Sequence, residues 1–310
     1  MTKFAFVFPG QGSQAVGMLD AWAQDSAAQQ VLEQANVALG EDLSGLIARG
    51  PGEQLNLTTN TQPAMLTASL AMLAAWRAAQ GPQASVMAGH SLGEYAALTA
   101  AGALSLADAV RLVRIRADAM QAAVPVGTGA MAAILGLEDD AVIAVCHQAA
   151  QSEVVEAVNF NAPSQVVIAG HKAAVERAME NAKAAGAKRA VMLPVSAPFH
   201  SSLLKPAAAV LGQALAAVEV RLPEVPVIHN VDVQIHQTAA EIRQALVDQA
   251  WHPVRWVQTI EAMAAQGVTH VVECGPGKVL SGLVKRIAPQ MTGLSVTDPA
   301  SMRAAIEAVS

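Results

Sequence analysis

The chain has 310 residues, of which 53% are hydrophobic and 14% are charged. This balance excludes a disordered chain, because disorder requires few apolar and many charged residues. The length allows one large domain, or a large domain that carries a smaller one. The net charge of −6 argues against a nucleic-acid partner, since binding to nucleic acid usually requires a basic surface.

No segment of the sequence is expected to enter a membrane or to direct secretion. The longest stretches without a charge, residues 64–76 and 95–107, are shorter than the roughly 20 apolar residues that a membrane helix needs. Residues 1–8 form too short an apolar run for a signal peptide. Cys146 and Cys274 lie far apart in the sequence and match no disulfide or zinc spacing. We therefore expect a cytoplasmic protein.

Short apolar strands alternate with helices along most of the chain. In chain order, strands are predicted at residues 4–8, 85–88, 226–231 and 270–274. Helical periodicity between them covers, for example, residues 63–80, 108–123 and 254–266. Because the strands are apolar without alternation, they indicate a mainly parallel sheet that helices cover on both faces. The predicted fold class is α/β.

The middle of the chain follows a different order of elements. It reads as a strand at 130–135, a helix at 139–150, strands at 154–160 and 165–169, a helix at 172–185 and a strand at 189–194. The order βαββαβ is the ferredoxin-like arrangement. We therefore predict an inserted ferredoxin-like subdomain at residues 127–196, carried by a catalytic core that residues 1–126 and 197–310 form.

Ser91 is the centre of a G-x-S-x-G segment that follows a predicted strand and opens a predicted helix. This context predicts a sharp turn that exposes the serine hydroxyl as a nucleophile. Gly89 and Gly93 fit the turn, because larger side chains there would collide with the turn or the substrate. The N–H of Leu92, directly after the nucleophile, is expected to stabilise an oxyanion. Taken alone, the segment could also be a glycine-rich loop with an incidental serine.

A second glycine-rich turn follows the first strand, in the sequence Phe8-Pro9-Gly10-Gln11-Gly12-Ser13-Gln14. As a nucleotide loop it lacks the lysine of a P-loop and the third glycine of a dinucleotide fingerprint. Together with Gly89-His90-Ser91-Leu92-Gly93-Glu94, it resembles the malonyl-CoA:acyl carrier protein transacylases. Further matching segments are residues 116–121, 159–163, 165–171, 196–201 and 273–278. The resemblance covers nearly the whole chain and implies an α/β-hydrolase-like core with an inserted ferredoxin-like domain.

The resemblance also assigns a base and an oxyanion donor. It places the catalytic histidine at His200, which would remove the proton from the serine hydroxyl. No Asp or Glu stands out as a partner for this histidine. The resemblance implies that the main-chain carbonyl of Gln249 orients the ring instead. The second oxyanion N–H would be that of Gln11. His90 is expected at the edge of the pocket, with its ring turned away across the elbow.

Arg116 is the residue that the resemblance assigns to the malonyl carboxylate. A guanidinium binds a carboxylate through two parallel hydrogen bonds, which a lysine cannot reproduce. Family members often carry glycine where this chain has Ala117. Phe199 precedes the histidine, as in malonyl-selective relatives, and is expected to leave little room for a branched methylmalonyl unit. Asn159 and Gln62 are expected to line the pocket.

The implied reaction is a ping-pong transfer. Malonyl-CoA would acylate Ser91, and the phosphopantetheine thiol of acyl carrier protein would then accept the malonyl group. No metal or other cofactor is implied. We expect the enzyme to supply fatty acid biosynthesis, because a free-standing chain without fused domains is expected there. We also expect a monomer. The carrier protein is typically acidic, and the candidate basic contacts are Lys188, Arg189, Lys278, Lys285 and Arg286.

Three other functions stay open at this point. The nearest is the malonyl transferase subunit of a malonate decarboxylase, which uses the same chemistry. A serine thioesterase or esterase is the second, although the missing acid and the presence of Arg116 argue against it. A carrier-binding module without activity is the third, and the intact Ser91, His200 and Arg116 argue against that.

Overall fold

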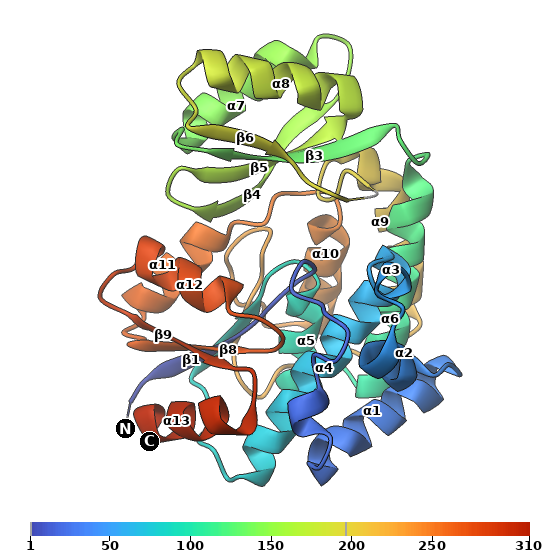
Figure 1. The fold of residues 1–310 in the computed structure, drawn as a ribbon, viewed down its shortest axis with the longest axis vertical. Helices are drawn as coiled ribbons and strands as arrows, with labels where there is room; N and C mark the ends of the chain where they lie inside the picture. Colours follow the sequence, from blue (N-terminus) through green and yellow to red (C-terminus); the bar gives the residue numbers. More distant parts are fainter. Residues whose placement is uncertain (1, 196) are drawn as a thin grey trace.

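The computed structural model describes residues 2–195 and 197–310. Ser196, which ends the predicted insertion and begins the family-like segment 196–201, lies outside the described residues. A five-stranded sheet runs through the larger part of the molecule (Figure 1). Its strands are β1 (Phe4–Phe8), β2 (Val86–Gly89), β7 (Val227–Ile228), β8 (His270–Cys274) and β9 (Thr292–Val296). Their order is β7-β2-β1-β8-β9, and every pair is parallel, which confirms the predicted sheet.

Helices connect these strands and cover the sheet. They are α1 (Ser26–Leu39), α2 (Leu43–Arg49), α3 (Gly52–Leu55), α4 (Thr58–Ala78), α5 (Gly93–Ala100), α6 (Leu106–Ala123), α9 (Lys205–Ala216), α10 (Ala239–Gln249), α11 (Trp256–Ala265), α12 (Val279–Ile287) and α13 (Pro299–Val309), with short 3-10 helices η1 (Asp20–Trp22) and η2 (Ser202–Leu204). No helix in the described part of the chain combines the length and the apolar character that crossing a membrane requires.

Strand β1 is buried along its whole length because both faces of the sheet are covered. Successive side chains of a strand point to opposite faces. Phe4, Phe6 and Phe8 accordingly belong to the core that packs against α1, α4 and α6. Ala5 and Val7 belong to a second core, formed with α11 and α12. The apolar run that predicted the strand therefore supplies both cores at once.

The middle of the chain forms a separate antiparallel sheet, at the top of Figure 1. Its elements are β3 (Gly129–Leu135), α7 (Asp139–Ala150), β4 (Val155–Ala162), β5 (Gln165–His171), α8 (Lys172–Ala184) and β6 (Arg189–Met192). The strand order is β4-β5-β3-β6, which is the order that a βαββαβ unit produces. Helices α7 and α8 cover the outer face of the sheet (Figure 1).

Two elements differ from the prediction. The strand predicted at 226–231 contains only two residues, because the chain leaves the sheet after Ile228. Its polar residues His229 and Asn230 are thereby released for other contacts. Strand β9 is absent from the prediction, since its sequence Thr-Gly-Leu-Ser-Val has few apolar residues. It lies at the edge of the sheet and is partly exposed, so it does not need an apolar run.

Candidate active site

Ser91 lies where two neighbouring parallel strands end. Phe8 of β1 is paired with Gly89 of β2, so the turns that follow these residues meet at one edge of the sheet. The His90 N–H donates a hydrogen bond to the Phe8 carbonyl at 2.9 Å, which joins the two turns. The carboxyl edge of a parallel sheet is the usual place for a site in α/β proteins.

The turn at Ser91 requires both of its glycines. A Cβ on Gly93 would lie 2.0 Å from the Phe8 carbonyl oxygen, and a Cβ on Gly89 would lie 1.9 Å from Gly93. Ser91 itself has a φ of +52°, in the left-handed region that non-glycine residues rarely adopt. This conformation projects the hydroxyl group out of the turn and keeps α5 directly behind it.

The hydroxyl group of Ser91 contacts the ring of His200. Ser91 Oγ and His200 Nε2 are 2.7 Å apart, and His200 Nδ1 is 2.8 Å from the main-chain oxygen of Gln249. Because a carbonyl oxygen only accepts, Nδ1 carries the hydrogen and Nε2 is free to accept one from the serine. The structure thus brings together the three residues at which the sequence placed a nucleophile, a base and a ring-orienting carbonyl.

His200 is held in its neutral form. Its side chain is buried, and burial together with the charge of Arg116 lowers its pKa to about 3. An imidazole that is neutral at physiological pH keeps a lone pair available as a proton acceptor. A carboxylate that binds Arg116 would cancel part of the charge that lowers this pKa and would make the imidazole a stronger base.

Arg116 of α6 is buried and reaches the nucleophile. Its Nη2 donates to Ser91 Oγ at 3.0 Å and to Gln249 Oε1 at 2.9 Å, while Nη1 donates to Gln62 Oε1 at 2.7 Å. The guanidinium carbon lies 5.6 Å from the centre of the Tyr95 ring. Burial lowers the pKa of Arg116, but an arginine side chain keeps its charge at neutral pH. A cation thus lies beside the serine, and among the described residues its direct contacts are with neutral groups.

The other arginines of this helix have different surroundings. Arg114 forms two hydrogen bonds with the Glu41 carboxylate, at 2.7 and 2.8 Å, and Arg111 donates to the Ala38 carbonyl at 3.0 Å. Both contacts lie at the surface. Of the three arginines on α6, Arg116 is therefore the one that enters the site.

A cavity of about 130 Å³ adjoins Ser91, Arg116 and His200. Further lining residues are Gln11, Gln62, His90, Met131, Asn159, Leu193, Val195 and Phe199. All the residues predicted to line a pocket are among them. The His90 ring nitrogen Nε2 lies 2.8 Å from Asn161 Oδ1, away from the serine hydroxyl. The cavity has room for a small acyl group with a carboxylate.

Two main-chain N–H groups near the nucleophile have no acceptor among the described residues: that of Leu92, which follows Ser91 in the chain, and that of Gln11, which lines the same cavity. Gln11 also lines the cavity, and its side-chain Oε1 accepts a hydrogen bond of 2.5 Å from Thr58. Donors fixed in this way can stabilise the oxyanion that forms when the serine attacks a thioester.

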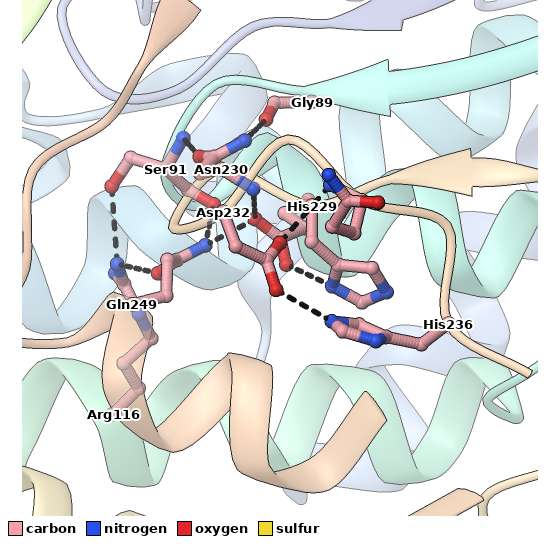
Figure 2. Close-up of polar contacts among 10 residues, drawn as sticks. Gly89, Ser91, Arg116, His229, Asn230, Asp232, His236 and Gln249 are labelled. Carbon is pink, nitrogen blue, oxygen red and sulfur yellow. Dashed lines mark hydrogen bonds and ion pairs between the residues drawn. The ribbon is translucent and has the colours of Figure 1, made fainter. Parts of the chain in front are cut away.

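A buried polar network beneath the elbow was not predicted. The Ser91 N–H donates to Asn230 Oδ1 at 2.7 Å, and Asn230 Nδ2 donates to the Gly89 carbonyl at 2.7 Å (Figure 2). Glu94, at the start of α5, is fully buried and contacts His229. A single acidic residue at the head of an otherwise apolar helix was the available signal. Its partners lie 135 to 155 residues away in the sequence, which periodicity cannot reveal.

Comparisons with known proteins agree with this chemistry. Residues 5–300 match the model of the acyl transferase domain family. The malonyl CoA-acyl carrier protein transacylase of Escherichia coli strain K12 is 54% identical over 308 residues, which cover 99% of this chain and 100% of that protein. The enzyme of the same name from Bacillus subtilis is 46% identical, over 99% of this chain and 97% of that protein.

Solved structures agree as well. The acyl-carrier-protein S-malonyltransferase of Burkholderia pseudomallei has a TM-score of 0.97 and 60% identity, and the match covers 99% of this chain and 100% of that one. A malonyl-transacylase solved in complex with a type II polyketide synthase acyl-carrier protein has a TM-score of 0.98 and 50% identity, with 99% and 100% coverage. The chain therefore belongs to the acyl transferase family and, within it, to the malonyl CoA-acyl carrier protein transacylases.

Proposed function

We propose that this enzyme transfers the malonyl group of malonyl-CoA to the phosphopantetheine thiol of acyl carrier protein, and so supplies fatty acid biosynthesis. The observation that carries the proposal is the position of Ser91 Oγ, which lies 2.7 Å from His200 Nε2 and 3.0 Å from Arg116 Nη2. One group can remove the proton of the nucleophile, and the other can bind the carboxylate of the acyl group that it attacks.

In the first half-reaction, His200 accepts the proton of the Ser91 hydroxyl while the serine oxygen attacks the thioester carbonyl. The N–H groups of Gln11 and Leu92 hold the oxyanion of the tetrahedral intermediate. When this intermediate collapses, the carbon–sulfur bond breaks, and His200 returns the proton to the departing thiolate of coenzyme A. A malonyl ester of Ser91 remains.

The second half-reaction runs through the same groups in reverse. The thiol of the carrier protein gives its proton to His200, and its sulfur attacks the serine ester. The serine oxygen leaves and takes the proton back from His200. A main-chain carbonyl, here that of Gln249, suffices to orient the histidine because both exchanging groups are thiols, which leave more easily than amines.

The buried position of Arg116 favours malonyl rather than acetyl as the acyl group that the enzyme transfers. With malonyl bound, its buried guanidinium pairs with a carboxylate, whereas acetyl would leave the charge without a partner in a closed cavity. Phe199, which lines the same cavity, would restrict branching beside the α-carbon. The malonate decarboxylase and esterase alternatives have no observation in their favour.

The transfer is tested by incubating the enzyme with malonyl-CoA and holo acyl carrier protein, and by following malonyl carrier protein with mass spectrometry. We expect product with wild-type enzyme and none with Ser91→Ala. Carrier protein without its phosphopantetheine group is the matched control and should stay unmodified. Product formation that persists in Ser91→Ala would contradict a serine intermediate.

The carrier protein is expected to dock on basic residues around α12. Lys278 and Lys285 are exposed, and Arg286 donates to the Pro163 carbonyl at 3.1 Å and to Gln165. Gln165 and Arg189 both pair with Leu135 of β3, so Arg189 and Arg286 border one end of the antiparallel sheet. An acidic carrier is attracted to such a cluster.

We also propose that residues 127–196 form a subdomain inserted into a core of residues 1–126 and 197–310. A separate cluster of buried side chains supports this division, because all its members lie between Ala130 and Ala190. Native-state hydrogen exchange tests it: the amides of β3 and β5 should become exposed together, in a step distinct from the opening of β1 and β8. A single common opening would argue against the division.

The enzyme is proposed to work as a monomer in the cytoplasm. All the groups assigned to the reaction come from one chain, so no second copy is needed to complete the site. Cys146 and Cys274 are both buried and free, which suits a reducing compartment. Light scattering of the purified enzyme should give the mass of one chain, and cell fractionation should recover the protein with the cytosol. A dimer, or recovery with membranes, would contradict these assignments.

A further inference from the structure

The carboxylate of Glu94 is the acceptor at the centre of the buried network. Its Oε1 accepts from His229 Nδ1 at 2.7 Å, and its Oε2 accepts from the Asn230 N–H at 2.9 Å and from Gln249 Nε2 at 3.0 Å. The side chains of Glu94 and Gln249 are completely buried, and that of His229 is nearly so. Glu94 touches neither Ser91 Oγ nor the cavity, so any effect on the reaction must pass through its partners.

Gln249 is the partner that connects Glu94 to the reacting groups. Its amide nitrogen also donates to the Ser91 carbonyl at 2.8 Å, and its amide oxygen accepts from Arg116 Nη2 at 2.9 Å. Figure 2 shows the Arg116 guanidinium beside this amide and directed toward Ser91. The amide therefore lies between a carboxylate on one side and a guanidinium on the other.

The two ends of an amide differ in what they can bind. A carboxylate only accepts hydrogen bonds and a guanidinium only donates them. With the NH2 group toward Glu94, the oxygen of Gln249 must face Arg116, and every contact pairs a donor with an acceptor. The reverse orientation would place the NH2 group against the guanidinium, and the oxygen against Glu94 and the Ser91 carbonyl. Glu94, the Ser91 carbonyl and Arg116 thus favour the same orientation, and Glu94 is the charged one of the two acceptors of the Gln249 NH2 group.

We propose that Glu94 is a positioning residue that fixes the Gln249 amide, and through it holds Arg116 at Ser91 for recognition of the malonyl carboxylate. The inference rests on the proposed function, because it assumes that Arg116 binds this carboxylate. Glu94 makes the enzyme selective without touching the substrate. Its buried negative charge orients the Gln249 amide, and this amide in turn holds the Arg116 guanidinium in place. The side-chain contacts of Asn230 with Ser91 and Gly89 do not include Glu94.

Glu94→Gln is the variant that tests this role. An amide at position 94 can present either a donor or an acceptor, so the NH2 group of Gln249 keeps only the neutral Ser91 carbonyl as a fixed acceptor, and the amide is held less firmly against Arg116. We expect the rate of Ser91 loading at low malonyl-CoA to fall about 10- to 100-fold, which corresponds to the loss of one charge-assisted hydrogen bond. Loading from acetyl-CoA, which does not use Arg116, should change by less than about threefold.

Three further variants make the test specific. Glu273→Gln is the matched control, because Glu273 is also completely buried but caps α12 through the Ser281 N–H at 2.8 Å, and both loading rates should stay near wild type. Glu94→Asp keeps the charge at a shorter reach and should show a smaller loss, which covers the case in which Glu94→Gln folds poorly. Gln249→Ala keeps the main-chain carbonyl, and adding Glu94→Gln to it should cause little further loss of selectivity.

The measurement is the ratio of malonyl to acetyl loading on Ser91, followed by intact-protein mass spectrometry against time. A ratio that falls in Glu94→Gln, and no further when Gln249→Ala is already present, supports the proposal. Equal loss of both acyl groups, or full additivity of the two substitutions, would overturn it and leave the proposed function intact. If wild-type enzyme loads no malonyl group at all, the proposed function itself fails, and this inference fails with it.

Discussion

At the scale of single residues, the nucleophile and the base share an unusual backbone conformation. Ser91 has a φ of +52° and His200 a φ of +66°, and both values lie in the left-handed region. For a residue with a side chain, such a conformation costs about 1–3 kcal/mol, which the surrounding structure must offset. The backbone strain therefore falls on two residues whose side chains exchange a proton, over the 2.7 Å between Ser91 Oγ and His200 Nε2.

The lowered pKa of His200 predicts how stability depends on pH. Its folded value is about 3 and its unfolded value 6.5, so between these values the unfolded chain binds a proton that the folded chain does not. The stabilisation that His200 provides is therefore fully present above its unfolded pKa of 6.5, and it is lost progressively as the pH falls from 6.5 toward the folded pKa of about 3. From pH 7 to pH 5, wild type should lose about 2 kcal/mol more unfolding free energy than His200→Gln. Urea denaturation at both pH values measures the difference, and equal losses would contradict the buried neutral imidazole.

Arg116→Lys tests whether the shape of the cation matters as well as its charge. Lysine keeps the positive charge but cannot form two parallel hydrogen bonds with a carboxylate. We expect kcat/KM for malonyl-CoA to fall about 10- to 100-fold, with most of the loss in malonyl recognition. Arg111→Lys on the same helix is the control and should behave as wild type, since the polar contacts of Arg111 with the Ala38 carbonyl and Asp108 lie at the surface. Unchanged malonyl kinetics in Arg116→Lys would exclude a bidentate role.

At the scale of elements, the elbow depends on how closely α5 approaches β1. Gly93→Ala would place a methyl group 2.0 Å from the Phe8 carbonyl oxygen, so the helix would have to move. We expect a loss of about 3 kcal/mol or more in unfolding free energy, together with loss of Ser91 acylation. Gly212→Ala in α9 is the control, because its nearest contact is an ordinary 3.6 Å to Val247; it should be neutral or slightly stabilising. A Gly93→Ala enzyme with wild-type stability would contradict this reading of the turn.

Sequence patterns predicted the part of the site that the turns after β1 and β2 form, because the conformation of a turn depends on neighbouring residues. The G-x-S-x-G turn placed Ser91 and Leu92 after β2, and parallel neighbours brought the turn of Gln11 to the same edge. The positions of His200, Arg116 and Gln249 came instead from family resemblance, since their contacts with Ser91 span 25 to 158 residues of sequence. The assignment of the Gln11 N–H as an oxyanion donor came from the resemblance as well.

The buried network was missed for a physical reason. The apolar pattern at 226–231 predicted a full strand, and a strand would have used the main-chain groups of Asn230 in a ladder. The chain instead leaves the sheet after Ile228, and the Asn230 N–H donates a hydrogen bond to the Glu94 carboxylate. Tertiary hydrogen bonds prevailed over local strand propensity here, as they often do where polar residues end a strand.

At the scale of the whole molecule, the order of elements predicted both sheets except for the edge strand β9.

Lys285→Glu tests where acyl carrier protein docks on the enzyme. An acidic carrier should bind this variant about tenfold more weakly than wild type, and the difference in affinity should shrink at high salt. Arg303→Glu changes the charge equally on α13, which Figure 1 shows at the end of the molecule away from the antiparallel sheet, and it should leave affinity unchanged. Calorimetry with holo carrier protein measures both, and equal affinities would exclude α12 as the docking surface.

The central claim is that a malonyl group rests on Ser91 between the two thiols. The most direct measurement is the intact mass of the enzyme after a brief incubation with malonyl-CoA, followed by addition of holo carrier protein. We predict that wild-type enzyme gains the mass of one malonyl group, that digestion places this group on the peptide that contains Ser91, and that the carrier then removes it. A wild-type enzyme that transfers malonyl without this adduct, or a Ser91→Ala enzyme that still carries it, would contradict the account.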